Sequence, residues 1–435
     1  MKIRGHDVSP LCTVLILGAI LRLAIAPFFA DPFDFAFWTS TAFDVRTGSG
    51  IYLNYDFWYT PLWGYVISLM SPLIDLFNFV PSQELWIGMS NDDLSTGDGW
   101  VASIGTIVVL KIPLIAADVV NGLLINKIVR KITDDDKKAL YASIMWVFNP
   151  LSIWISSGQG QFDTIALMFI LLGILAYLDG SLAVCGLSVS AAVMTKAFPA
   201  FMVLPMLALI LFRKEGRVDI KGASLYAVGG IAMTFLLILP QLLTGEMQFV
   251  TSFFTDRLFG THPVPQGFDP TAMSFFSEYI YPRTDRSDYL LPSLAVMLIV
   301  TVFIAVKRMD AKNGIIMLMT SLCVFLIWIP APGFPQYYVI PVGMLCLCSC
   351  IDIKFAYLAL FSGTVGVIHL YTCFEYASPM VVMGLFDLDT LYEIHDALGS
   401  AFGIFDGVIK TLRTVPMILA VVLSFIICRR SYCEE

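Results

Sequence analysis

Two aspartates follow the first long apolar run of the chain, in the stretch DPFDFAFWTSTAF at residues 31–43. Asp31 and Asp34 lie there among aromatic side chains, an unusual setting for carboxylates in so apolar a chain. A carboxylate held in this way near a membrane surface could take a proton from a hydroxyl group as a general base. A solvated turn is the alternative, and the proline at position 32 favours it. Position by itself favours the turn, so a catalytic role for either residue needs further evidence.

A second polar group interrupts the apolar sequence in NPLSIWISSGQGQFDTIALMF, residues 149–169. Gln159, Gln161 and Asp163 follow a break in the predicted helix at Asn149. Non-helical backbone at membrane depth needs protein cover or a water-filled cavity, so these side chains could line a polar ligand site. An ordinary connecting turn, with Asp163 capping the next helix, explains the same residues.

Four charged residues lie inside apolar runs: Arg22, Lys111, Asp118 and Lys196. Ionisable groups are costly at that depth and usually face a partner or a polar pathway. Lys111 and Lys196 fall nearest the predicted outer face, where a cation would suit the phosphate of a lipid. A structural ion pair of Lys111 with Asp118, two turns along one helix, is the alternative.

GFPQYYV, residues 333–339, presents Gln336, Tyr337 and Tyr338 at another predicted span boundary. These side chains could contact a substrate, or the tyrosines could serve as interface anchors. No His-x-x-x-His or Glu-x-x-His spacing occurs, and the cysteines of 346–350 suit a small apolar role. We therefore expect neither a metal nor another cofactor.

The composition indicates the elements that must position these residues. The chain is 58% hydrophobic and 14% charged, and its mean hydropathy is +0.80. These values predict an all-α, polytopic membrane helix bundle formed by residues 1–435 as a single domain. A net charge of −8, with no dense basic tract, excludes nucleic-acid binding.

Apolar runs long enough to approach a bilayer crossing predict about 12 spans, with a range of 10–13. The runs are 11–30, 101–126, 139–157, 163–179, 182–196, 198–212, 222–241, 291–306, 314–330, 337–351, 355–373 and 414–428. The first is too long for a signal-peptide core, so we expect it to be retained. The two short runs around position 196 suggest a broken pair.

Lysine and arginine cluster in loops that fall on one side if the spans alternate, and this side is predicted to be cytoplasmic, with both termini. The opposite side then carries a long outer loop at 31–100, with the aspartate motif, and a second outer loop at 242–290. The multi-pass protein would lie in a prokaryotic plasma membrane, which we favour, or in the endoplasmic reticulum.

The segment 61–80 is apolar enough to span the membrane. Counting it as a span would reverse every later loop, so we interpret it as an interfacial amphipathic helix. Its expected anchors are Trp58, Tyr59, Trp63 and Tyr65. The sequence alone does not exclude a true span here.

Several motifs resemble, in their order along the chain, the polytopic GT-C glycosyltransferases, and in particular the first mannosyltransferases of glycosylphosphatidylinositol synthesis. The first motif is DPFDFAFWTSTAFDVRTGSGIYLNYDFWYTPL at 31–62, and NPLSIWISS at 149–157 is similar to the third span of the same family. GQGQFD at 158–163 is similar to the glucosyltransferases of dolichol-linked glycan assembly and to bacterial and archaeal relatives. The Lys-x-Pro at 111–113 and the motifs KAFP at 196–199 and PQYY at 335–338 resemble relatives that use polyprenyl-phosphate sugars.

The resemblance implies transfer of a mannosyl or other hexosyl residue at the outer face, with inversion and without a metal. The donor would be a polyprenyl-phosphate sugar, and the acceptor a lipid-linked or protein-linked glycan. The mannosyltransferases carry Asp-x-Asp, and its first aspartate falls here at Pro32, which favours Asp34 over Asp31 as the base. Lys111, Lys196 or Tyr338 would then stabilise the departing phosphate.

Other functions share some of these features. A multi-span transporter also has broken spans and buried charges, but it usually shows repeated halves, and the NPLSI and GQFD patterns occur once each. A lipid flippase or a non-catalytic subunit could keep the scaffold without the base.

Overall fold

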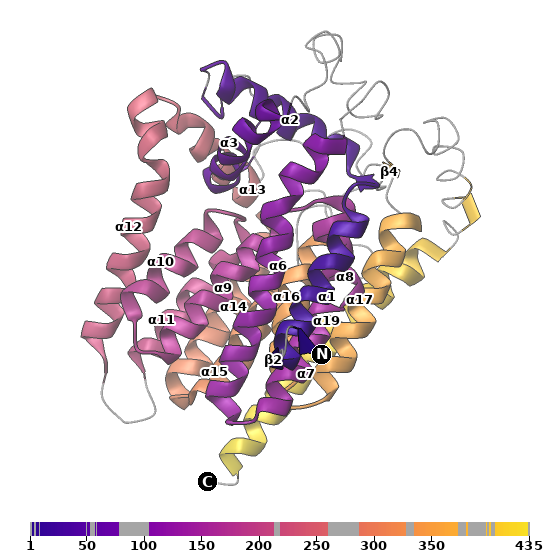
Figure 1. Ribbon diagram of the computed structural model, residues 1–435. Coiled ribbons are helices and arrows are strands. Elements are labelled where there is room, and N and C mark those ends of the chain that lie inside the picture. The colour runs from indigo at the N-terminus through magenta and orange to yellow at the C-terminus, as the bar shows by residue number, and fades with distance from the viewer. Residues whose placement is uncertain are drawn as a thin grey trace.

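Helices lie within each of the twelve apolar runs in the computed structural model of the chain (Figure 1). The structure describes residues 2–3, 6–7, 9–48, 50–52, 57, 59–77, 104–212, 218–259, 287–327, 335–372, 380–381, 397, 400–401 and 405–433. Much of the two predicted outer loops, at 78–100 and 260–286, lies outside these residues, as does Trp58.

The first half of the chain forms short helices around one long one. Its helices are α1 (Pro10–Ile25), α2 (Pro32–Arg46), α3 (Pro61–Leu76), α6 (Ile104–Thr133), α7 (Asp136–Val147), α8 (Pro150–Ile153), the π-helix η1 (Trp154–Gln159), α9 (Asp163–Leu178), α10 (Leu182–Val193), the 3-10 helix η2 (Phe198–Met202) and α11 (Val203–Leu211).

The second half continues the bundle with α12 (Ile220–Thr244), α13 (Met247–Phe259), α14 (Ser287–Lys307), α15 (Ala311–Ile327), the 3-10 helix η5 (Pro335–Tyr338), α16 (Val339–Cys348), α17 (Lys354–Thr372) and α19 (Asp406–Cys433). Two short antiparallel strand pairs complete the described elements. They are β1 (Lys2–Ile3) with β2 (His6–Asp7), and β3 (Phe29–Ala30) with β4 (Met380–Val381).

The helix lengths fit a membrane protein without fixing the number of spans. Three helices of the described part are long and apolar enough to cross a bilayer: Ile104–Thr133, Ile220–Thr244 and Thr411–Ser431. A fourth crossing is added if Asp136–Val147 and Pro150–Gln159, which meet at a bend of 53°, count as one broken span. The remaining apolar stretches, such as Leu294–Lys307 in α14 and Lys354–Leu370 in α17, have 10–17 residues, below the roughly 20 that a straight crossing needs. The helical membrane bundle is thus confirmed, and the count of about 12 spans stays a prediction.

The two ends of the bundle carry different segments. Figure 1 shows α2, α3 and α13 together at the upper end, whereas the turn between α6 and α7 lies at the lower end. Lys111, near the start of α6, donates to the carbonyl of Phe29, just after α1. Phe29 and this part of α6 therefore lie at the same end of the bundle, and whether the segment 61–80 crosses the membrane stays open. The predicted outer segments gather at the upper end.

Cationic residues mark the lower end, as the sequence predicts. Lys131, in the last turn of α6, forms an ion pair with Asp179, which follows α9. Lys137 and Lys138 lie in the first turn of α7. The cationic loop at 213–217 falls outside the described residues.

A buried ion pair ties α1 to α6. The Arg22 Nε atom donates to Asp118 Oδ2 at 2.8 Å, and Arg22 NH2 donates to the Ser152 hydroxyl at 2.9 Å. The Thr164 hydroxyl donates to the other Asp118 oxygen. Asp118 therefore pairs with Arg22 across two helices, and its expected pairing with Lys111 along α6 is wrong. These two buried charges are tolerated because polar groups from several helices form hydrogen bonds with them.

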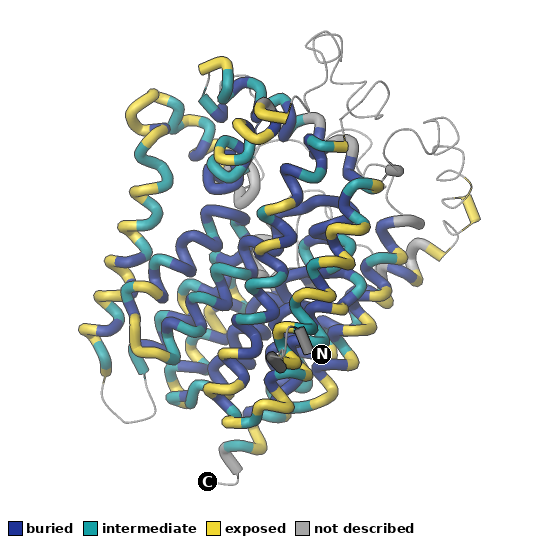
Figure 2. The backbone as a smooth tube through the Cα atoms, viewed as in Figure 1, coloured by how far each residue is buried: buried dark blue, intermediate teal, exposed yellow. Residues whose placement is uncertain are grey.

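The centre of the bundle is apolar and its outer helices are half exposed. Figure 2 shows buried backbone through the interior helices and exposed residues along α12. α12 approaches α10 closely because Gly186 and Gly229 lie in their contact. A Cβ atom would stand 1.9 Å from the Tyr226 carbonyl oxygen at the first and 2.1 Å from the Ala183 carbonyl oxygen at the second. Small residues of this kind let membrane helices pack backbone to backbone.

Candidate functional site

Asp31 begins α2 and caps it. Its Oδ1 atom accepts a hydrogen bond from the backbone N–H of Asp34 at 3.2 Å, the usual role of an N-cap aspartate. Its Oδ2 atom accepts from Gln159 Nε2 at 3.1 Å, and its own N–H donates to the Gln159 carbonyl at 3.0 Å. Asp31 thus joins the start of α2 to the end of η1, which makes it a positioning group more than a free base.

Asp34 lies in the first turn of α2, 7% exposed, with both carboxylate oxygens oriented by donors. The Tyr59 hydroxyl donates to Oδ1 at 2.5 Å, and Gln161 Nε2 donates to Oδ2. Each carboxylate oxygen keeps a second lone-pair direction, so the group retains the capacity to accept another proton. The structure therefore brings Asp34 and Gln161 together, as the sequence indicated.

Tyr59 is held in place by its neighbours in the same segment. Tyr52 donates its hydroxyl to the Tyr59 carbonyl at 2.9 Å. Burial raises the pKa of Tyr52, with the Coulombic effects of Tyr65 and Glu246 adding to it, so this phenol stays protonated as a donor. The backbone N–H of Leu62 donates to the Met194 carbonyl at 3.4 Å, which joins the segment to the end of α10.

The anchors expected around this segment point into the protein. Trp63 is fully buried and stacks on Phe162, with ring centroids 5.0 Å apart. Tyr65 donates its hydroxyl to the Leu237 carbonyl at 2.7 Å and to Gln241 Oε1 at 3.0 Å, both on α12. Trp63 is therefore not the interface anchor that the sequence predicted, whereas Tyr59 and Tyr65 are partly exposed and their role as anchors stays a prediction.

The π-helix η1 delivers both glutamines to the aspartates. The backbone N–H groups of Gly160 and Gln161 both donate to the Ile155 carbonyl at 2.8 Å, which ends the helix. Gly160 follows with φ of 87°, and a Cβ atom there would lie 2.4 Å from the Phe35 ring. Glycine fits where a left-handed backbone also passes close to a side chain. The interrupted backbone predicted at this depth is confirmed, and protein covers it.

Lys111 supports this same segment. Its ammonium donates to the carbonyl groups of Ala26 at 3.2 Å, Ser157 at 2.8 Å and Gly158 at 2.9 Å, and to that of Phe29. The side chain is completely buried. An ammonium has three N–H donors, and these carbonyl groups occupy them all. In this structure Lys111 therefore holds the backbone around η1, away from the phosphate contact expected for it.

Lys196 lies in the turn between α10 and η2, facing Asp163 at the start of α9. Their Nζ and Oδ2 atoms are 3.2 Å apart, and the lysine side chain is 10% exposed. The ammonium also lies over the rings of Phe162, Tyr337 and Tyr59, at 4.3, 5.2 and 5.7 Å from their centroids. Such contacts favour a desolvated cation. Lys196 thereby lies between two tyrosines: Tyr59, which donates to Asp34, and Tyr337, which belongs to η5.

Gln336, Tyr337 and Tyr338 of η5 lie in different surroundings. Tyr337 borders Lys196, whereas Tyr338 packs under the guanidinium of Arg413, 4.9 Å from its ring centroid. Gln336 is buried, and its Oε1 atom has no hydrogen-bond partner among the described residues. Tyr338 is buried as well, so it is not an interface anchor.

The assembled cluster combines a carboxylate, two amides, a paired cation and several aromatic rings at the upper end of the bundle. Asp34 supplies a proton acceptor, and Lys196 supplies positive charge two contacts away, with Tyr59 between them. Sequence reasoning missed the hydroxyl of Tyr59 as a partner of Asp34, although the residue belongs to the Tyr-Thr-Pro-Leu motif. It also missed Arg413, which lies at the edge of the last apolar run.

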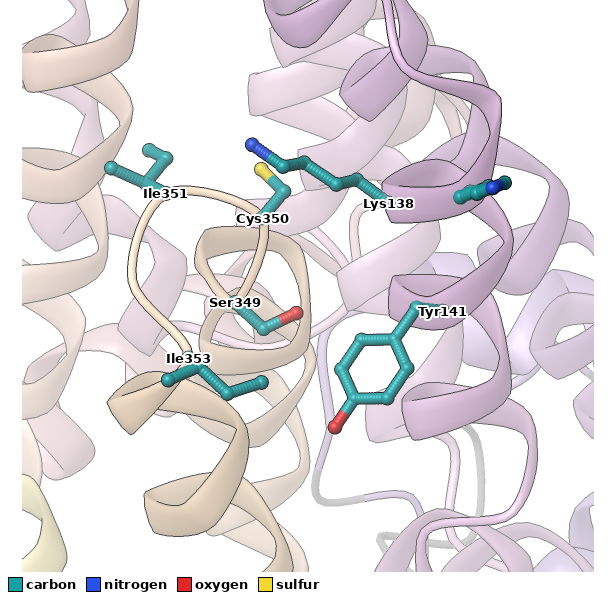
Figure 3. Close-up of a pocket in the computed structure, with 7 residues that line it drawn as sticks. Lys138, Tyr141, Ser349, Cys350, Ile351 and Ile353 are labelled. Carbon is teal, nitrogen blue, oxygen red and sulfur yellow. The ribbon is translucent and has the colours of Figure 1, made fainter.

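A pocket of about 470 Å³ opens at the other end of the bundle, between the start of α7 and the turn that joins α16 to α17. Figure 3 shows the Lys138 side chain extending toward Cys350 across this pocket. Its lining consists of Lys137, Lys138, Tyr141, Ser349, Cys350, Ile351 and Ile353. It contains none of the residues around Asp34, so it is separate from the candidate site.

Comparison with known proteins gives one family match. The model of the PIG-U family, a GPI transamidase subunit, matches residues 93–266, which is less than half of the chain. No curated protein matches the chain.

Several solved structures are similar in backbone course at low sequence identity. The oligosaccharyltransferase of Archaeoglobus fulgidus, in its apo form, has a TM-score of 0.46 and 11% identity over 94% of this chain. ArnT from Cupriavidus metallidurans, bound to undecaprenyl phosphate, has a TM-score of 0.49 and 12% identity over 95% of this chain. The present chain covers 76% of ArnT but only 56% of the oligosaccharyltransferase.

Proposed function

We propose that the protein is a membrane glycosyltransferase that moves a hexose, with mannose the first candidate, from a polyprenyl-phosphate donor to a glycan acceptor. The acceptor is linked to a lipid or a protein, and transfer takes place at the upper end of the bundle, outside the cytoplasm. The whole chain acts as one unit, with its catalytic motif in the 31–100 segment. The observation that carries this proposal is the carboxylate of Asp34, buried and oriented by Tyr59 and Gln161.

The chemistry is a single displacement with inversion. The acceptor hydroxyl oxygen forms a bond to the anomeric carbon as the bond from that carbon to the phosphate oxygen breaks. Asp34 takes the hydroxyl proton, and the electron pair of the broken bond leaves with the polyprenyl phosphate. A correctly placed base contributes about 10²- to 10⁴-fold to such a step, and nearby positive charge stabilises the leaving phosphate.

Lys196 is the cation that Tyr59 links to Asp34. Its ammonium contacts both Asp163 and Tyr59, the latter being the hydroxyl donor to Asp34. The carboxylate of Asp163 places an opposite charge 3.2 Å from this ammonium in apolar surroundings. The ordered motifs that resemble the GT-C glycosyltransferases include each of these residues, which supports the same reaction from the sequence side.

The experiment replaces Asp34 by asparagine and follows transfer of radiolabelled sugar from dolichyl- or undecaprenyl-phosphate mannose and glucose in membranes. Asp34→Asn keeps the size of the side chain and removes the base, so we expect transfer to fall about a hundred-fold or more. Asp44→Asn makes the same change farther along α2 and should retain the wild-type rate. Unchanged transfer by Asp34→Asn would end its role as the base.

A second candidate function follows from the PIG-U match at 93–266. The protein would then be a non-catalytic subunit that holds a glycolipid in the same cluster. In that case the wild-type chain transfers no sugar from any of the donors, and Asp34→Asn binds a glycosylphosphatidylinositol lipid as tightly as the wild type. Transfer by the wild-type chain excludes this alternative.

A further inference from the structure

The pocket at the lower end of the bundle has a chemistry that the candidate site does not explain. It measures about 470 Å³ and lies between the start of α7 and the turn that joins α16 to α17. Lys137 and Lys138 supply its charge, and none of the described residues that line it is acidic. The Lys138 side chain extends across it toward Cys350 (Figure 3). A concave surface lined by charges of one sign attracts ligands of the opposite sign.

The acidic groups next to the two lysines are already oriented by other donors. Asp135 Oδ1 accepts hydrogen bonds from the backbone N–H groups of Lys137 and Lys138 at 2.9 and 3.1 Å. The carboxylate of Asp136 pairs with Arg130 at 2.7 Å. Asp135 attracts both lysines electrostatically, but neither ammonium group forms a hydrogen bond or an ion pair within the described part of the chain. The ammonium groups are therefore available to a ligand, whereas the first amides of α7 are not.

The other wall of the pocket adds to the positive charge. Lys312, exposed at the start of α15, lies near enough to Cys350 for its charge to act on the thiol, as the charge of Lys138 does. Asp352, in the turn between α16 and α17, accepts the backbone N–H of Lys354 at 2.9 Å. Lysines from two separate helices thus surround the space, which suits an anion larger than a single chloride.

Exposed apolar side chains lead from this pocket along both of its helices. Ile353 lines the pocket just before α17, and Tyr357 and Leu360 follow it at helical spacing. Tyr141 lines the pocket on α7, and Phe148 lies two turns farther along the chain. All five side chains are exposed. Because α7 and α17 both begin at the lower end, these apolar surfaces extend from the cationic pocket toward the middle of the bundle.

We propose that this pocket binds an anionic phospholipid of the surrounding membrane. Its phosphate lies at Lys137 and Lys138, and its acyl chains lie along the exposed side chains of α7 and α17. Basic pockets between helices at the cytoplasmic surface suit headgroups of this kind, and the charge bias of the sequence predicts that surface at the lower end. A soluble phosphate would use the lysines but leave the apolar surfaces without a partner.

The bound lipid has a structural consequence for the helix that leads to η1. Asn149, after the end of α7, donates from Nδ2 to the Ala359 carbonyl on α17 at 3.1 Å. A lipid at the pocket connects the same two helices at their other ends. The proposal does not depend on sugar transfer, because no residue of the Asp34 cluster lines the pocket.

The test measures saturable binding of radiolabelled dioleoyl phosphatidylglycerol to the purified full-length chain in neutral detergent micelles. The double variant Lys137→Gln/Lys138→Gln should bind at least about tenfold more weakly, because it removes both charges. Lys127→Gln/Lys221→Gln is the matched control, since it removes the same charge from exposed positions on α6 and α12, and it should bind as the wild type does.

Wild-type affinity in the Lys137→Gln/Lys138→Gln protein, or an equal loss in the control, would overturn the proposal. If the first variant does not fold, Ile353→Glu decides, because it places a negative charge at the exposed edge of the pocket. Unchanged binding by this second variant would also overturn the site. Asp34→Asn should bind the lipid normally, so failure of this site and failure of the proposed reaction give different results.

Competitors identify the chemistry of the ligand. Neutral dioleoyl phosphatidylcholine should compete weakly, and equal competition by it would overturn the requirement for an anionic headgroup. Glycerol 3-phosphate carries the phosphate without acyl chains and should also compete weakly. Equal competition by this soluble anion would overturn the assignment to a lipid. Tyr357→Ser, outside the pocket on α17, should weaken binding of the lipid by a small factor, and unchanged binding would remove the acyl chains from this surface.

Discussion

The ammonium group of Lys111 meets four backbone carbonyl groups with only three N–H bonds. Replacement by methionine keeps the apolar stem and removes every donor. The four carbonyl groups that the ammonium contacts then lose this hydrogen-bond partner. We expect Lys111→Met to lower the free energy of unfolding by on the order of 3 kcal/mol. Thermal unfolding in detergent, followed by intrinsic fluorescence, should show a clear fall in the midpoint.

The matched control for this change is Lys131→Met at the lower end. Lys131 pairs with Asp179, but both side chains are more than 40% exposed, and such pairs contribute about 0–1 kcal/mol. Its midpoint should stay close to that of the wild type. If Lys111→Met unfolds at the wild-type temperature but loses affinity for undecaprenyl phosphate, the original prediction of a phosphate ligand is right and the structural role is wrong.

The sequence predicted some of the residues that lie together at the candidate site, but few of their contacts. Asp34 and Gln161 could be grouped, because orientation placed both at the same membrane face and the motifs agreed. The pairing of Asp34 with Tyr59 was not predictable, since a turn of unknown course separates them. The carbonyl contacts of Lys111 were not predictable either, because every residue has a backbone carbonyl group and no residue pattern marks the ones that a side chain binds.

At the scale of elements, the junction between η1 and α9 controls where Gln161 lies. Gly160→Ala places a Cβ atom 2.4 Å from the Phe35 ring and on a backbone with φ of 87°. The left-handed backbone alone costs about 1–2 kcal/mol with a side chain. The steric conflict adds to this and displaces α2, which carries Asp34. We expect a lower unfolding midpoint together with strongly reduced sugar transfer.

The variant Gly180→Ala separates the cost of the left-handed backbone from the effect of the steric conflict with Phe35. Gly180 also has a positive φ, 74°, but nothing lies within 4 Å of the Cβ position. This variant should lose stability through backbone conformation alone and keep its transfer rate. Equal effects of the two substitutions on transfer would show that contact with Phe35 does not position the site.

The boundaries of the helices show a limit of prediction from local sequence patterns. The apolar runs predicted the helices, and Asn149 with Pro150 predicted the break that separates α7 from α8 at 53°. The π-helix was not predictable from local pattern, because side chains of other helices bind in and next to it: Lys111 of α6 donates to the Ser157 and Gly158 carbonyl groups of η1, and Arg22 of α1 donates to Ser152 just before η1. Sequence patterns predict which face of a helix is apolar, but they do not predict which backbone carbonyl group a buried side chain will bind.

At the scale of the whole molecule, charge bias predicted which segments share an end. The contact of Lys111 with Phe29 and the ion pair of Lys131 with Asp179 place the two termini of α6 accordingly. The number of crossings is not fixed in the same way, because many of the apolar helices are too short to span a straight path. Long-range ion pairs such as Arg22 with Asp118 show which helices are neighbours. The spacing of residues along the sequence does not predict this.

The direction of the bundle in the membrane decides whether the site faces away from the cytoplasm, and single cysteines test it. Gln248, exposed on α13, belongs to the upper end, whereas Lys312 is exposed at the start of α15, where its neighbour Asn313 contacts Ser431 near the end of α19. Lysine-rich loops stay cytoplasmic, so a membrane-impermeant maleimide should label Gln248→Cys in intact cells and label Lys312→Cys only after permeabilisation. The unsubstituted chain gives the background of its own cysteines. The reverse pattern would place Asp34 on the cytoplasmic side, where the acceptor and donor would both have to be presented from within the cell.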